Sequence, residues 1–182
     1  MARRGGEVDG GKVAPSPGDE RHQRPAARGL VIAGSVAVVV VVVDQLTKSW
    51  AVRRLSHGDI HVVWKLDLEL TYNSGASFGL ARGWAPVIAG IALAAVVLLL
   101  SAVRHARSDA LTVALGLIIG GALGNLTDRL VRGHHGAVVD FIALHFWPTF
   151  NVADSCVVIG AVSAALLISR RHVPDASGGA AP

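Results

Sequence analysis

The 182 residues are enough for one domain, and 52% of them are apolar whereas only 16% are charged, against about 25% charged in soluble domains. This composition excludes a disordered chain and favours a membrane protein, and the single cysteine, Cys156, excludes an intramolecular disulfide framework and a cysteine-cluster metal site. The net charge of +4 is not taken to indicate nucleic-acid binding, because many basic residues flank apolar runs, as they do in membrane proteins.

The first 28 residues are rich in Gly, Pro and Arg and have no apolar period, so we expect a disordered basic extension. Four apolar segments follow, and a membrane-crossing helix needs about 20 such residues. We expect an all-α membrane protein with four transmembrane helices, in a domain of residues 29–171 followed by a flexible tail, 172–182. The predicted spans are about 29–51, 84–103, 110–129 and 151–169.

Basic residues cluster before the first span, between the second and third spans, and after the fourth. Positive residues near span ends favour the cytoplasm. We therefore expect both termini inside and the two longer loops outside.

In the third span, Gly116, Gly120 and Gly124 form a ladder of small residues that predicts a helix-packing face.

The first outside loop contains one clear pattern, a strict alternation of polar and apolar residues over 65–72. This is the period of a half-buried strand, and Asn73, Ser74 and Gly75 then indicate a turn. The pattern fits a small sheet on the membrane surface with its leucine face toward lipid or the helices. An ordinary surface hairpin explains the alternation equally well.

Polar residues interrupt three of the spans at one depth. Fifteen residues precede Asp44 in the first span, fifteen precede Asn125 in the third, and fifteen separate Asp154 from the end of the fourth. At about 1.5 Å per residue, each polar group lies roughly 22 Å from the cytoplasmic boundary. Ionisable groups at that depth are costly, so they must be paired or functional.

Two interpretations remain open for the charged neighbours. Asp44 and Lys48 are four residues apart on one helix face, and Asn125 shares a face with Asp128 and Arg129. The pairs Asp44–Lys48 and Asp128–Arg129 are explained equally well as structural ion pairs that hold helices together and as parts of a functional site.

Asp140 and Asp154 stand apart, because Asp140 lies within an apolar stretch and Asp154 has only Asn151 as a local polar partner. Apolar surroundings raise the pKa of a carboxyl group. Two such acids brought together would share a proton and activate a water, as in aspartic proteases. The spacing alone leaves this dyad and a proton or cation path as comparable alternatives.

Five blocks of sequence together resemble the lipoprotein signal peptidase (signal peptidase II) family, in the family's order. They are DQLTK at 44–48, NSGASF at 73–78, GGALGNLTDR at 120–129, VVDF at 138–141 and FNVAD at 150–154. The resemblance implies an aspartyl peptidase of the bacterial inner membrane, with its site on the extracytoplasmic side. It would cut signal peptides from diacylglyceryl-modified prolipoproteins before the lipidated cysteine, and globomycin would inhibit it.

The same resemblance assigns roles to particular residues. Asp140 and Asp154 match the catalytic pair. The positions that match supporting or substrate-binding residues are Asp44, Lys48, Asn73, Gly75, Asn125, Asp128, Arg129 and Asn151. The strand segment resembles the family's small extracytoplasmic sheet. No cofactor or metal is expected. The expected partners are prolipoproteins, membrane lipids and globomycin-type inhibitors. We expect no nucleic-acid binding and a monomeric protein.

Two departures from the family are the long N-terminal extension and the segment 130–139, which exceeds the commonest spacing. Two rival functions remain: a proton-coupled transporter or channel subunit with Asp44, Asp128 and Asp154 as a relay, and a purely structural membrane protein. A transporter would need access from both sides. Three of the spans carry no ionisable residue in the fifteen residues nearest the cytoplasm, which favours a one-sided site.

Overall fold

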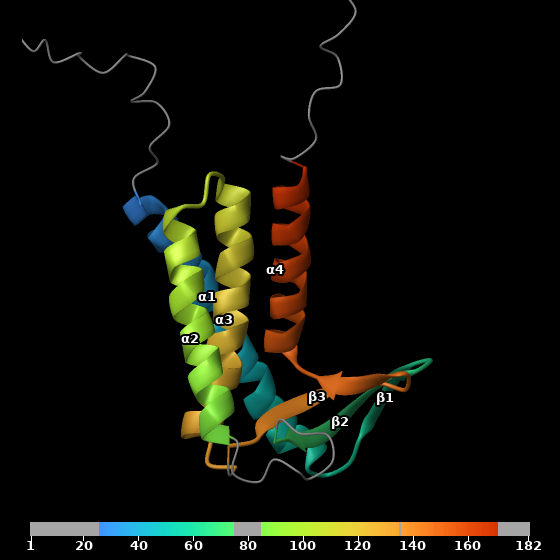
Figure 1. Cartoon of the computed structure of the whole chain (residues 1–182). Coiled ribbons are helices and arrows are strands. Elements are labelled where there is room, and N and C mark those ends of the chain that lie inside the picture. The colour runs from blue at the N-terminus through green and yellow to red at the C-terminus, as the bar shows by residue number, and fades with distance from the viewer. Residues whose placement is uncertain (1–25, 75–84, 135, 171–182) are drawn as a thin grey trace, which may run out of the picture.

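A computed structural model of the chain describes residues 26–74, 85–134 and 136–170, where four helices form a bundle and four strands form one sheet (Figure 1). The helices are α1 (Ala26–Leu55), α2 (Ala85–Arg104), α3 (Asp109–Val131) and α4 (Val152–Ser169). The strands are β1 (Ile60–Val63), β2 (Leu66–Asn73), β3 (Val138–Leu144) and β4 (Trp147–Phe150). The sheet lies at one end of the bundle, whereas α1 begins and α4 ends at the other.

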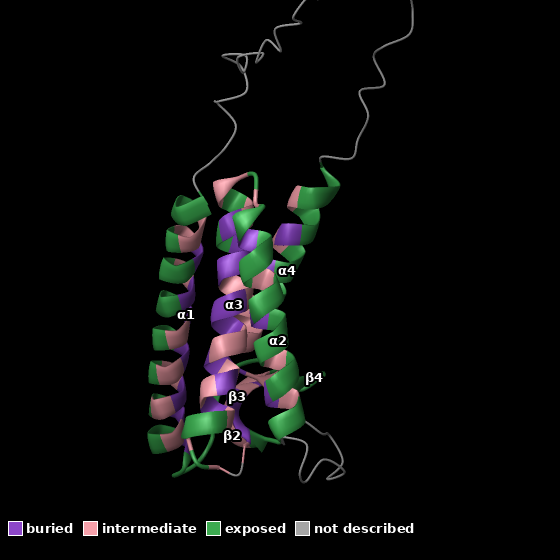
Figure 2. Cartoon of the chain, turned by 60° about the vertical axis from the view of Figure 1, so that its left-hand side comes forward, coloured by how far each residue is buried: buried purple, intermediate pink, exposed green. Residues whose placement is uncertain are grey.

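Each of the four helices is long and apolar enough to cross a membrane. The outer surface of the bundle is apolar too: the side chains of Val38 and Leu98 are 63% and 71% exposed. Figure 2 shows the buried residues of α1 facing α3 and the exposed ones facing outward. An apolar surface of this extent is stable in lipid and not in water, so the expected class of four-helix membrane protein with a small sheet is confirmed.

Glycines on α3 allow close contact with α1. A Cβ atom at Gly116 would lie 2.9 Å from the Ala33 carbonyl oxygen, and one at Gly120 would lie 2.7 Å from Val40 Cβ. A Cβ atom at Gly124 would lie 2.7 Å from a carboxyl oxygen of Asp44. The ladder predicted from the sequence is therefore the face of α3 that packs against α1. At Gly124 this close packing brings the backbone of α3 against Asp44.

Two further glycines, which the sequence analysis did not identify, bring α3 against α4. A Cβ atom at Gly160 on α4 would lie 2.6 Å from the Ala114 carbonyl oxygen, and one at Gly121 on α3 would collide with the Ala153 carbonyl oxygen. Helix α3 thus lies between α1 and α4, with both backbones close to it.

The four described strands pair antiparallel in the order β1-β2-β3-β4. The strand predicted over 65–72 is β2, whereas β1, β3 and β4 were not predicted. Strand β3 is buried on both faces along most of its length, so its sequence lacks the alternation that identifies a half-buried strand. Thr71 pairs with Asp140 and Asn73 pairs with Val138, a register that brings the end of β2 beside Asp140.

A second apolar core joins the sheet to the end of α1. Ala51 and Leu55 of α1 and Phe141 of β3 are its buried members, and the β2 leucines Leu68 and Leu70 pack against them. The leucine face of the predicted strand therefore faces the helices. This contact fixes the sheet, and with it Asp140, relative to α1.

Most of the extension 1–28, the tail 172–182, and Gly75 lie outside the described residues. Within the described part, α1 extends beyond the expected span of 29–51 at both ends. In the segment 130–139, α3 continues to Val131, and Gly133 and Gly136 adopt positive φ angles of 77° and 80° before β3 begins. Glycine reaches such angles without strain, which suits this tight return of the chain.

Candidate active site

Polar side chains converge where α1 and α3 meet the first turn of α4 and strand β3. Five of the six fully buried polar side chains among the described residues lie here, namely Asp44, Lys48, Asp128, Asp140 and Asn151. Asn125 and Asp154 are half-buried members of the same cluster. The common depth predicted from the fifteen-residue spacings therefore corresponds to physical contact between three helices.

Lys48 is the centre of the buried network, with no exposed side-chain surface. Its Nζ atom lies 2.8 Å from Asp44 Oδ2 and 3.0 Å from Asp128 Oδ2, and it donates a hydrogen bond of 2.9 Å to Asn125 Oδ1. All three ammonium hydrogens thus have an acceptor. The predicted Asp44–Lys48 ion pair is confirmed within α1, and the contacts of Lys48 with Asp128 and Asn125 link α1 to α3.

Asp128 pairs with a different arginine from the one predicted. The sequence analysis paired it with the adjacent Arg129, but its salt bridges run to Lys48 and to Arg132, whose Nε lies 3.1 Å from Asp128 Oδ1. Neighbours on a helix point about 100° apart, whereas Arg132 is four residues along and shares the face. Arg132 also donates to Gln45 Oε1 at 2.8 Å, which ties α3 to α1.

Backbone groups from the sheet and from α4 attach to the same carboxylates. The Val139 amide donates to Asp128 Oδ2 at 3.0 Å, and the Ala153 amide donates to Asp44 Oδ1 at 3.0 Å. Asp128 therefore holds the start of β3, and Asp44 holds the first turn of α4. The Asp44–Lys48–Asp128 group is a structural platform for the two elements that carry Asp140 and Asp154.

Asp140 is 1% exposed and accepts two amide hydrogen bonds. Asn151 Nδ2 donates to its Oδ1 at 2.6 Å, and Asn73 Nδ2 donates to its Oδ2 at 2.9 Å. Burial raises the pKa of Asp140 to about 6, and the charge of Asp154 adds to the rise, although both amide hydrogen bonds oppose it. The elevated pKa expected from the apolar sequence context is thus present.

Asp154 lies in the first turn of α4, where Asn151 is the N-cap residue. The Asn151 Oδ1 atom accepts from the Asp154 amide at 2.9 Å, and Asp154 Oδ2 accepts from the Asn151 amide at 3.2 Å, which forms a capping box. The other carboxyl oxygen of Asp154 accepts from Asn125 Nδ2 at 2.8 Å. Helix capping therefore fixes the orientation of this carboxylate.

Two asparagines link the two acids. Asn151 Nδ2 donates to Asp140 and also lies 3.1 Å from Asn125 Oδ1, and Asn125 in turn donates to Asp154. Asn151 thus contacts both acids, one through its side chain and the other through the capping box. The residues that the sequence analysis assigned to one site are brought together, except Gly75, which lies outside the described residues.

Arg129 places a further positive charge beside the acids. Its Nη1 donates to the Asn125 carbonyl oxygen at 3.3 Å, and its guanidinium interacts electrostatically with Asp140, Asp154 and Asp128. Its Nε atom is buried with no hydrogen-bond partner among the described residues. The role of Arg129 is therefore electrostatic and distinct from the direct pairing predicted with Asp128.

An apolar cavity of about 380 Å³ opens beside Asp154. Asp154 and Ser155 supply polar groups at one side, while the hairpin of β3 and β4 supplies aromatic rings and α4 supplies branched aliphatic chains. The lining residues are Leu144, Phe146, Trp147, Phe150, Asp154, Ser155, Val158 and Ile159. Its volume and apolar lining are those of small-molecule sites, and the carboxylate of Asp154 forms part of its wall.

Two contributors to the site were missed in the sequence. Gln45 donates to Asp128 Oδ1 at 2.9 Å, and Arg132 pairs with the same carboxylate. The four-residue spacing from Asp128 to Arg132 could have predicted their pairing. The sequence carries no such signal for Gln45, because its partner Asp128 lies on another helix. Within the described ranges, no three His, Cys, Asp or Glu side chains are arranged to hold a metal ion.

The chain is similar in sequence to one family of known proteins. Residues 36–170 match the family described as signal peptidase (SPase) II. The lipoprotein signal peptidase of Paraburkholderia phymatum is 40% identical over 149 residues, covering 76% of this chain and 87% of that protein. The lipoprotein signal peptidase of Mycolicibacterium smegmatis is 39% identical over 155 residues, covering 82% of this chain and 66% of that protein.

Two solved structures of bacterial membrane enzymes have the same fold. One superposes with a TM-score of 0.68 at 26% identity and covers 82% of this chain and 94% of its own. The other gives a TM-score of 0.67 at 28% identity and covers 75% of this chain and 91% of its own.

Proposed function

The chain belongs to the signal peptidase II family and is a membrane peptidase, and we propose that it removes signal peptides from diacylglyceryl-modified prolipoproteins. Cleavage occurs before the lipidated cysteine, by water that two aspartates activate. The observation that carries this proposal is the placement of Asp140 and Asp154, which come from a strand and a helix and are both held by Asn151. The apolar cavity beside Asp154 supports it, because the substrate is lipidated.

The charges in the cluster support a shared proton. Four buried or half-buried carboxylates face three cations, Lys48, Arg129 and Arg132. The group is neutral when one carboxyl carries a proton, and a neutral group is the state that a low-dielectric site favours. Asp44 and Asp128 have direct salt-bridge partners, so the proton falls to the pair Asp140 and Asp154.

The proposed reaction assigns one role to each acid. Asp154 takes a proton from water as the water oxygen attacks the scissile carbonyl carbon, and Asp140 gives its proton to the carbonyl oxygen. The tetrahedral intermediate then collapses: the C–N bond breaks, Asp154 protonates the leaving nitrogen, and the hydroxyl proton returns to Asp140. The pKa of about 6 suits Asp140 to the acid role, because it keeps its proton to a higher pH than an ordinary aspartic acid does.

The remaining site residues position the two acids. Asn73 and Asn151 orient Asp140, and Asn125 orients Asp154. Arg129 interacts with both acids and so offsets the negative charge that passes from Asp154 to Asp140 during the attack. Gly75 is assigned to substrate contact by family position alone.

The membrane placement follows from the charge distribution. We assign the protein to the bacterial inner membrane as a monomer. Both termini are assigned to the cytoplasm, since 10 of the 17 Lys and Arg residues precede the first span, lie between the second and third, or follow the fourth. The sheet and the acids then lie on the extracytoplasmic side. A lipidated substrate reaches them laterally from the bilayer.

The test is cleavage of a lipidated prolipoprotein by the purified protein in detergent, with and without globomycin. The proposal predicts globomycin-sensitive release of the signal peptide by the parent protein. Asp140→Asn and Asp154→Asn abolish release but still elute as folded protein, whereas Asp59→Asn, an exposed loop substitution of the same chemistry, retains turnover. Parental turnover by either of the first two variants would refute the assigned chemistry.

A further inference from the structure

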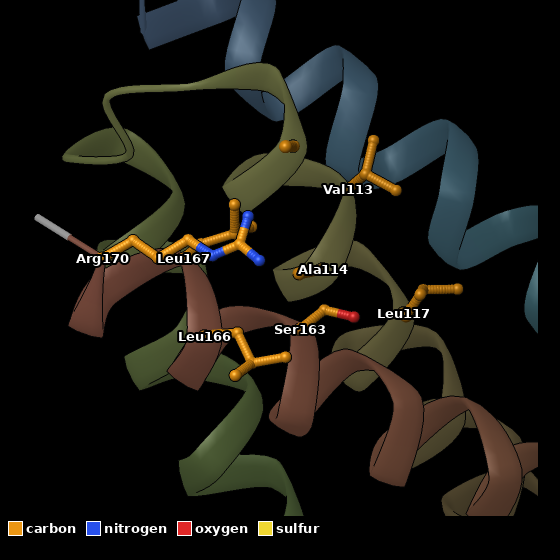
Figure 3. Close-up of a pocket in the computed structure, with 8 residues that line it drawn as sticks. Val113, Ala114, Leu117, Ser163, Leu166, Leu167 and Arg170 are labelled. Carbon is orange, nitrogen blue, oxygen red and sulfur yellow. The ribbon is translucent and has the colours of Figure 1, made fainter.

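A second cavity, of about 450 Å³, lies at the end of the bundle opposite the sheet, between the first turns of α3 and the last turns of α4. Apolar side chains form most of its wall, with Ser163 and Arg170 as the polar members. The lining residues are Ala110, Val113, Ala114, Leu117, Ser163, Leu166, Leu167 and Arg170 (Figure 3). Its volume falls within the range of about 300–1,000 Å³ that is typical of small-molecule sites.

The shape of this cavity follows from how α3 and α4 pack. The two backbones touch at Gly160, where a Cβ atom would lie 2.6 Å from the Ala114 carbonyl oxygen. Beyond that contact, toward Leu167 and Arg170, the cavity opens between the helices. It is therefore a wedge that is closed in the interior of the bundle and open at its end. In a membrane-spanning bundle, such a wedge is bordered by lipid.

Arg170 gives the wedge a positive charge. Figure 3 shows its guanidinium extending from the end of α4 toward α3. Among the described residues, Arg170 forms no salt bridge, and the carboxylate of Asp109 at the start of α3 is paired with Arg28 at 3.3 Å. A guanidinium above an apolar wedge is complementary to a molecule with an anionic head and an apolar chain.

We propose that this wedge binds an anionic phospholipid, with one acyl chain between α3 and α4 and the phosphate against Arg170. The ligand is a membrane lipid, because the apolar wall is too extensive for a free phosphate. The assigned orientation places the wedge in the cytoplasmic leaflet, whose surface potential is negative. The site is separate from the acids at the opposite end, so it is independent of the proposed catalytic chemistry.

The test is lipid binding by the full chain in detergent, measured by native mass spectrometry. Phosphatidylglycerol and phosphatidylcholine with identical acyl chains are the probes, and inorganic phosphate is added as competitor. The variants are Arg170→Gln, which removes the charge, and Ser163→Phe, which fills the wedge. Arg104→Gln is the matched control, because Arg104 is an exposed arginine at the same end but does not line the cavity.

The parent protein is expected to prefer phosphatidylglycerol about fivefold, which corresponds to about 1 kcal/mol for one basic residue near anionic lipid. Arg170→Gln loses the preference, Ser163→Phe loses both lipids, and Arg104→Gln matches the parent. Equal binding of the two lipids by the parent, equal losses in Arg170→Gln and Arg104→Gln, or displacement by phosphate would each overturn the proposal. If Ser163→Phe does not fold, the two arginine variants decide the question.

Discussion

Replacement of Asp140 by asparagine tests the effect of burying this carboxyl group on the stability of the fold. Its pKa rises from 3.8 to about 6 in the folded chain, mainly because burial disfavours the charged form. A difference of about two pKa units corresponds to ~3 kcal/mol. Asparagine is nearly isosteric and does not titrate, so the variant lacks this pH-dependent contribution.

The direction of the effect follows from proton linkage. Near pH 4 and below, the folded chain retains the Asp140 proton and the contribution to stability is present. As the pH rises to about 6, the unfolded chain releases the proton and the folded chain holds it, so the free energy of unfolding falls. Relative to the parent, Asp140→Asn should therefore gain about 2.4 of these ~3 kcal/mol between pH 4 and pH 7.

Only the change with pH is diagnostic. In the variant, one of the two amides that donate to Asp140 faces an NH₂ group, which costs about 1–3 kcal/mol at every pH. The assay is chemical unfolding in mixed micelles from pH 4 to pH 8. Ile142→Val on the same strand serves as control, with a constant loss of about 0.5–1.5 kcal/mol. Parallel stability curves for Asp140→Asn and the parent would refute the reasoning.

Three other measurements address the site and the bundle. The pH–rate profile should be bell-shaped, with apparent pKa values that belong to the acid pair and a falling limb at or above pH 6, where Asp140 ionises; a flat profile from acid to neutral pH would contradict a shared proton. Lys48→Met should lower the free energy of unfolding by about 3–5 kcal/mol, since it leaves buried carboxylates uncompensated, and adding Asp44→Asn should restore part of it; a strictly additive double-mutant cycle would contradict this coupling. Gly120→Ala should destabilise the protein by about 1–3 kcal/mol because its Cβ would lie 2.7 Å from a neighbouring side chain, whereas Gly34→Ala, with nothing within 4 Å, should not; equal melting temperatures would show that the helices can separate freely.

Local periodicity explains why much of the bundle was predictable. The spans follow from unbroken apolar runs, and the Asp44–Lys48 pair follows from the turn of the helix. The common depth of Asp44, Asn125 and Asp154 follows from counting residues at a fixed rise. These are properties of single helices, and they hold whatever the helices pack against.

The remaining features depend on tertiary packing and leave little trace in the sequence. Strand β3 was missed because burial on both faces removes its polar alternation. The spacing of Asp140 and Asp154 did not show that both contact Asn151, since these contacts depend on the position of β3 beside β2 and on the first turn of α4. Arg132 is a different case, because its four-residue spacing from Asp128 was readable in the sequence, but Asp128 was paired with the adjacent Arg129 instead.

Asn151 has consequences for how the protein can vary. The same side chain caps α4 and donates to Asp140, so a substitution that removes both polar atoms changes the hydrogen bonding of Asp140 and weakens the start of α4 together. Aspartate or serine at position 151 would keep an oxygen that can cap the helix but would lose the amide that Asp140 accepts from. Position 151 therefore joins the stability of a helix end to the hydrogen bonding of a buried acid in one side chain.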